Sequence, residues 1–102
     1  MSRQRLPNRR FSESFDFEAQ GLTFTATFSR GADGSVQEVF IRNHKASSMA
    51  GINASDASVL WSIARQYGVP FDVLQKSLMR NADGTGSGPL AVALDRIAER
   101  EP

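Results

Sequence analysis

Residues 38–70 read EVFIRNHKASSMAGINASDASVLWSIARQYGVP and contain the features that decide the fold. The first feature is the apolar run Val39-Phe40-Ile41, whose β-branched and aromatic side chains predict a buried strand over residues 36–42. A loop rich in small residues follows, and a helix is predicted over residues 55–67. This helix is expected to end because Gly68 favours the left-handed cap conformation and Pro70 cannot continue a helix.

The predicted helix has one apolar face at helical spacing, which we expect to pack on the sheet. Asn53 or Ser55 is the expected N-cap, and Asp56 suits the positive end of the helix dipole. Trp61 falls on the opposite side, where it either covers part of the sheet edge or marks a contact surface for a partner helix. The residues expected to point inward are Val59, Leu60, Ile63, Ala64 and Tyr67.

Two stretches before this segment alternate apolar and polar residues with a period of two, which is typical of strands with one buried face. They cover residues 11–18 and 22–29, and Gln20-Gly21 and residues 31–34 supply turn residues around the second. Together with residues 36–42 they predict an antiparallel meander whose apolar face needs a cover. The expected inward residues are Phe11, Phe15, Phe17, Leu22, Phe24, Ala26 and Phe28.

The cover is predicted to be helical. After the helix at residues 55–67, further helices are expected over residues 71–80 and 89–100, joined by a polar, glycine-rich linker. The predicted fold class is therefore α+β, a three-stranded antiparallel β-meander followed by three α-helices packed on one face. Inward positions of the later helices are Phe71, Leu74, Leu78, Leu90, Leu94 and Ile97.

The composition limits the chemistry. A chain of 102 residues fits one domain, and the lack of cysteine excludes disulfides, thiolate metal sites and thiol catalysis. No apolar run approaches the roughly 18 residues of a membrane span, and no hydrophobic segment follows the basic N-terminus. We therefore expect a cytoplasmic protein, without membrane contact and without a cofactor.

Charge divides the chain into a flexible basic arm, residues 1–10, and a mildly acidic domain, residues 11–102. The arm holds four arginines and no acid, which leaves eight basic and eleven acidic side chains for the domain. The arm either contacts phosphates of a nucleic acid or nucleotide, or acts as a solubilising tail. A nucleic-acid-binding accessory protein is thus one alternative, with Arg3, Arg5, Arg9 and Arg10 as its contacts.

The loop after the third predicted strand is the best candidate for a ligand site. Backbone N–H groups of a loop rich in small residues and the start of a helix can surround an anion, with charge from neighbouring cations. The alternative is that the small residues only let the loop pack tightly on the sheet. His44 is the only histidine, and a hydrogen-bonding role at the corner fits it better than catalysis or metal binding. The residues of this candidate anion loop are Arg42, His44, Lys45, Ser47, Ser48 and Asn53.

The chain resembles the TSCPD domain over about residues 21–99. The residues that carry the likeness are the runs EVFI at 38–41, HK at 44–45 and QYGVP at 66–70, together with Asn53. This domain occurs in the C-terminal part of adenosylcobalamin-dependent ribonucleotide reductases and in short stand-alone bacterial proteins. The cysteine-containing motif that names the family has no counterpart here, because residues 46–50 read ASSMA.

The resemblance implies a link to deoxyribonucleotide synthesis, but a chain of this size without cysteine lacks the means to reduce a ribonucleotide. The expected function is a non-catalytic module that associates with a ribonucleotide reductase, or binds a nucleotide or another protein. A homo-oligomeric structural domain is a further alternative, with a sheet edge or Trp61 at the seam.

Overall fold

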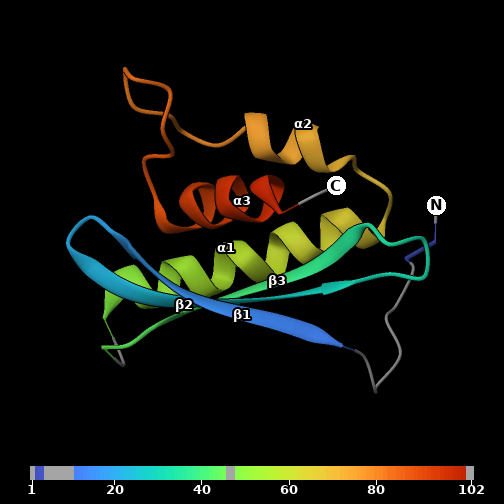
Figure 1. Ribbon diagram of the computed structural model, residues 1–102, viewed down its shortest axis with the longest axis horizontal. Coiled ribbons are helices and arrows are strands. Elements are labelled where there is room, and N and C mark those ends of the chain that lie inside the picture. The colour runs from blue at the N-terminus through green and yellow to red at the C-terminus, as the bar shows by residue number, and fades with distance from the viewer. Residues whose placement is uncertain (1, 4–10, 46–47, 101–102) are drawn as a thin grey trace.

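The computed structural model describes residues 2–3, 11–45 and 48–100. Its elements follow the order three strands, then three helices, and the helices lie on one side of the sheet (Figure 1). This confirms the predicted α+β fold. The strands are β1 (Ser12–Ala19), β2 (Leu22–Arg30) and β3 (Val36–Asn43), and the helices are α1 (Met49–Gln66), α2 (Phe71–Lys76) and α3 (Pro89–Glu99).

The sheet is an antiparallel meander in the order β1-β2-β3. Gln20 and Gly21 both have positive φ, 54° and 75°, which is the conformation of a two-residue hairpin turn whose twist matches that of the strands. The register pairs Phe17 with Phe24 and continues to β3 through Ala26 and Ile41. Alternate residues therefore form one apolar face, as predicted.

This apolar face and the helices enclose the core. Leu94 and Ile97 of α3 are fully buried, and Trp61 of α1 packs edge-on against Phe71 with ring centroids 5.6 Å apart. Trp61 thus belongs to the core of the monomer. Other core residues are Phe17, Phe24, Ala26, Phe28, Val36, Val39, Ile41 and Leu90.

Helix α1 supplies hydrogen bonds to the free edge of β3. Ser62 Oγ accepts a hydrogen bond from the Val39 N–H at 2.9 Å, and Ser58 Oγ accepts one from the Ile41 N–H at 3.2 Å. One turn further along the helix, the Gln66 side chain donates to a β3 carbonyl, that of Gln37. All three helix side chains are buried, so these bonds replace the fourth strand that would otherwise satisfy the edge.

The spacing of these bonds follows from the two element geometries. Residues four apart on a helix rise about 6 Å, and residues two apart on a strand rise about 6.8 Å. Polar residues at every fourth position of α1 can therefore meet every second residue of an antiparallel β3. At the start of α1 the approach is close enough that a Cβ on Gly51 would lie 2.8 Å from the Asn43 Cβ, so glycine is required there.

This arrangement reverses the predicted orientation of α1, so that prediction is wrong. The side that faces the sheet carries Ser58, Ser62 and Gln66, while Leu60 is 68% exposed and Tyr67 is 40% exposed. Hydropathy alone places the apolar stripe of α1 inward, but the edge of β3 requires hydrogen-bonding side chains on that side.

Several boundaries also differ from the prediction. Helix α1 begins at Met49, because Ser48 Oγ accepts from the Gly51 N–H and acts as N-cap in place of Asn53 or Ser55. Helix α2 ends at Lys76 rather than at residue 80. Phe11 precedes β1 and its side chain is exposed, so it is not part of the buried face.

Replacing Ser62 by alanine is expected to destabilise the fold. The substitution leaves the buried Val39 N–H without a partner, which costs about 1–3 kcal/mol. Urea denaturation of the Ser62→Ala variant measures this loss in the free energy of unfolding. The matched control is Ser55→Ala on the same helix, where the side chain is exposed. Equal stability of the two variants would contradict the capping role of Ser62.

Candidate functional site

The solvent side of α1 is apolar along most of its length. We call this surface the α1 outer face and define it as Met49, Ile52, Val59, Leu60, Ile63 and Tyr67. Met49 and Leu60 are each 68% exposed, and the other members are exposed or half-buried. Asp56 is the only charged residue between Met49 and Ile63. Exposed apolar surface of this extent is typical of sites that bind another molecule.

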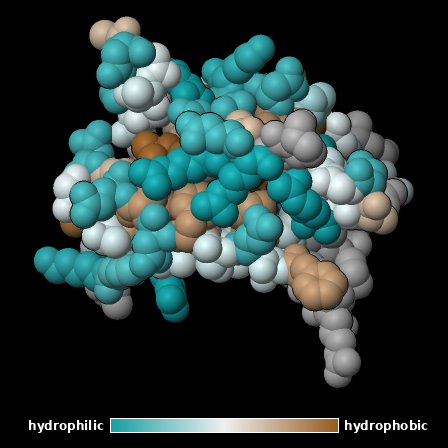
Figure 2. All heavy atoms as spheres, in the orientation of Figure 1, coloured by the Kyte–Doolittle hydropathy of each residue, from teal (hydrophilic) through white to brown (hydrophobic). Residues whose placement is uncertain are grey.

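Phe40 of β3 is a further exposed apolar residue, with 42% of its surface exposed. It lies between the buried residues Val39 and Ile41, so its side chain points to the face of the sheet opposite to the core. By contrast, the face of the molecule seen in Figure 2 is largely hydrophilic, with apolar side chains mainly in a seam between the helices and the sheet.

A pocket of about 320 Å³ lies beside the α1 outer face, between α1, the β1–β2 turn and the loop before α3. It is hollow because its walls carry small side chains, among them Ala50, Ala54 and Ala57 of α1. The remaining lining residues are Ala19, Gln20, Leu22, Phe24, Asn53, Leu78, Met79, Gly88, Pro89, Leu90 and Ala91. An apolar pocket of this size with a few polar groups is the usual form of a binding site.

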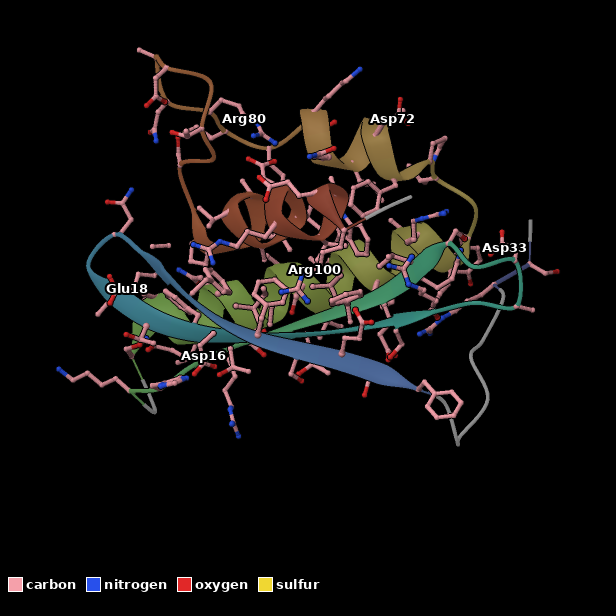
Figure 3. All side chains as sticks on the ribbon, in the orientation of Figure 1. Asp16, Glu18, Asp33, Asp72, Arg80 and Arg100 are labelled. Carbon is pink, nitrogen blue, oxygen red and sulfur yellow. The ribbon has the colours of Figure 1, made fainter. Side chains whose placement is uncertain are left out.

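Hydrogen bonds fix the rim of this pocket. The Gln20 side chain donates to the Ser87 carbonyl at 2.8 Å and joins the β1–β2 turn to the loop before α3. Arg80 reaches from that loop toward α3 and donates to Asp95 Oδ2 at 2.6 Å (Figure 3). The hydrogen bond from Arg80, supported by one from Gln75, lowers the pKa of the Asp95 carboxyl. The glycine-rich linker between α2 and α3 is therefore held by hydrogen bonds at both sides of the pocket.

The structure brings only some residues of the predicted anion loop close together. His44 Nε2 lies 2.7 Å from the Thr25 hydroxyl, which donates to Asp16 Oδ1 at 2.7 Å on the solvent face of the sheet. Arg42 is exposed on the same face of the sheet, and Lys45 is exposed just beyond β3. Basic groups thus lie at this corner, next to an acidic one.

The other predicted loop residues lie elsewhere or have another role. Ser48 Oγ is occupied by the Gly51 N–H and by the Asn43 side chain, at 3.0 and 2.7 Å. Asn53 lies within α1 and lines the apolar pocket. Ser47 is outside the described residues.

One residue of the basic arm is described with a contact. Arg3 donates from Nε to Gln66 Oε1 at 2.7 Å, next to the capped edge of β3. Arg5, Arg9 and Arg10 are outside the described residues.

Two general features are absent from the described part of the chain. Residues 2–3, 11–45 and 48–100 contain no group of three or more His, Cys, Asp or Glu side chains placed to hold a metal ion. No helix among the same residues has the length and apolar character needed to cross a membrane.

Comparison with known proteins identified no relative of this chain. Neither family models nor curated proteins nor solved structures gave a match to this chain. Several residues that carry the resemblance to the TSCPD domain support the fold. Residues 38–41 form part of β3, and the Gln66 side chain donates a hydrogen bond to the same strand.

The sequence alone does not predict this pocket. The alanines at positions 50, 54 and 57 follow helical spacing and were available as a signal of a small-residue stripe. A stripe of this kind normally indicates close packing of another element, so the pattern alone does not predict an unfilled space.

The Arg80–Asp95 pair predicts a pH dependence of stability. The folded-state pKa of Asp95 is lowered, so the pair contributes fully above the unfolded pKa of about 3.9 and is lost as the pH falls through the folded value. The Asp95→Asn variant should lose less stability than the wild type between about pH 5 and pH 3. Urea denaturation at several pH values measures the difference.

The matched control for this experiment is Asp56→Asn. It removes an exposed carboxylate that forms no hydrogen bond among the described residues. If the stability of Asp95→Asn and Asp56→Asn changed equally between pH 5 and pH 3, the Arg80–Asp95 pair would not stabilise the loop.

Proposed function

We propose that this chain is a non-catalytic protein-binding module that docks on its partner through the α1 outer face. The observation that carries the proposal is the distribution of polar and apolar residues on α1. Ser58 and Ser62 are buried on β3 beside the apolar Trp61. Large apolar side chains are left in solvent on the other side, where Met49 and Leu60 are each 68% exposed.

The fold does not require apolar residues on the outer face. The core is closed by the sheet, by α3 and by Trp61, and the β3 edge is satisfied by the polar side of α1. Polar side chains at positions 49 and 60 would leave these contacts intact. Burying a Leu or Met side chain against a partner contributes about 1.5–3 kcal/mol to the free energy of binding. These exposed residues can therefore stabilise a complex.

The outer face has a suitable length for a docking surface. Helix α1 has 18 residues and is therefore about 27 Å long. Exposed apolar residues lie along it from its first turn to its C-cap, Tyr67. Few charges interrupt it, which is the composition expected at the centre of an interface.

The partner we propose is an adenosylcobalamin-dependent ribonucleotide reductase. The resemblance to the TSCPD domain supports this choice, since that domain occurs in the C-terminal part of such enzymes. A chain without cysteine would act as an accessory subunit of the reductase and leave the chemistry to the catalytic chain. A nucleotide site at the loop after β3 has less support, because Ser48 caps α1 and Asn53 faces the pocket.

Placing a charge in the outer face is expected to weaken docking. The Leu60→Asp variant should bind a purified adenosylcobalamin-dependent ribonucleotide reductase at least about tenfold more weakly than the wild type, because the carboxylate must be desolvated in the interface. Isothermal titration calorimetry measures the affinity. Ser12→Asp is the matched control, since it adds the same charge on β1, at the other edge of the sheet from α1.

Two results would count against this proposal. One is the absence of measurable binding between the wild type and the reductase. The other is equal binding of Leu60→Asp and the wild type. Sedimentation of the isolated chain tests the competing homo-oligomer: self-association that Leu60→Asp abolishes would assign the outer face to a second copy instead.

A further inference from the structure

We infer that the pocket beside α1 receives one bulky apolar side chain of a docked peptide segment, and that Asn53 holds the backbone of that segment. This inference rests on the proposed function and specifies what the partner presents. The occupant is a Leu-like side chain on an extended or helical stretch of the partner chain.

The chain itself leaves the pocket unfilled. The pocket has a volume of about 320 Å³. Its lining is almost entirely apolar, so water inside finds few hydrogen-bonding groups. Met79 stands at the rim with 79% of its surface exposed rather than folding into the space. Filling this space with an apolar group is therefore favourable.

The polar groups of the lining distinguish a peptide from a plain hydrocarbon. Gln20 already donates its side-chain amide to the Ser87 carbonyl. Asn53 is exposed, and within the described part of the chain its carboxamide forms no hydrogen bond. A carboxamide offers both a donor and an acceptor, which is the complement of a backbone peptide group.

The pocket is continuous with the α1 outer face. Asn53 and Ala57 line the pocket, and they are four and three residues from Met49 and Leu60 on the same helix. Residues three and four apart are neighbours on a helix surface. A segment that lies across the outer face therefore reaches the pocket with one side chain, which is how a central anchor residue is placed in an interface.

The direct test uses capped amino acids as probes. Methyl NMR spectra of the full chain are recorded during titration with N-acetyl-leucinamide, N-acetyl-alaninamide and benzene. N-acetyl-leucinamide should shift the methyl signals of Ala50, Ala54 and Ala57 at millimolar concentration. N-acetyl-alaninamide should bind about fiftyfold more weakly, because it lacks three buried carbon groups that contribute about 0.8 kcal/mol each. Folded protein that shows no shift with N-acetyl-leucinamide would overturn the inference.

Variants separate the apolar and polar parts of the site. Gly88 has a φ of −114°, and a Cβ built there meets nothing within 4 Å, so Gly88→Leu can fill the rim without strain. It should abolish the shifts, and Ala57→Leu provides a second filling variant. Asn53→Ala should weaken N-acetyl-leucinamide severalfold and leave benzene unchanged. If benzene bound and N-acetyl-leucinamide bound no better than N-acetyl-alaninamide, the pocket would be a site for small apolar molecules. That result would refute the proposal that it receives a peptide side chain.

The same variants distinguish this inference from the proposed function. Leu60→Asp should leave N-acetyl-leucinamide binding unchanged while it weakens reductase binding. Gly88→Leu and Ala57→Leu should weaken both. If both filling variants fold and still bind the reductase fully, the anchor role of the pocket is refuted and the proposed docking through α1 stands.

Discussion

The hydrogen bonds from α1 to the free edge of β3 are the constraint on which the rest of this structure depends. An antiparallel sheet leaves every second residue of an outer strand with unpaired backbone groups, and in a small domain these groups must be satisfied or hidden. Here Ser58, Ser62 and Gln66 satisfy them. Because these side chains occupy part of the inner side of α1, several large apolar residues of the helix, among them Leu60, are left on the outside, while Trp61 stays in the core. The exposed surface is thus a consequence of how the edge is closed.

The two edges of the sheet are treated differently. No strand lies beyond β1 among the described residues. The backbone groups of alternate β1 residues point away from β2, so they have no neighbouring strand to pair with. This edge carries Asp16 and Glu18, and the Arg100 guanidinium lies 4.5 Å from the centre of the Phe15 ring. Charged side chains discourage further strand pairing. The β1 edge is therefore poorly suited to pairing with a further strand.

Much of the fold could be predicted from local patterns. Alternation with a period of two identified the strands, Gln20-Gly21 identified the turn, and the spacing of Leu90, Leu94 and Ile97 gave the buried face of α3. The orientation of α1 could not be predicted in this way, because hydropathy ranks Leu60 above Ser62 whatever the helix packs against. The serines at positions 58 and 62 gain their importance only from the β3 amides opposite them. The pocket could not be predicted either, because an alanine stripe such as residues 50, 54 and 57 normally indicates close packing of another element rather than unfilled space.

The position of the α1 outer face depends on the hydrogen bonds that cap β3, so the most direct measurement is made on the amides of β3. Native-state hydrogen exchange followed by NMR measures them one by one. Val39 and Ile41 should exchange only in the globally unfolded state, whereas Ser14 and Asp16 on the open edge of β1 should exchange orders of magnitude faster. If Val39 and Ile41 exchanged as fast as Ser14 and Asp16, α1 would not cap the sheet and its outer face would have no fixed position.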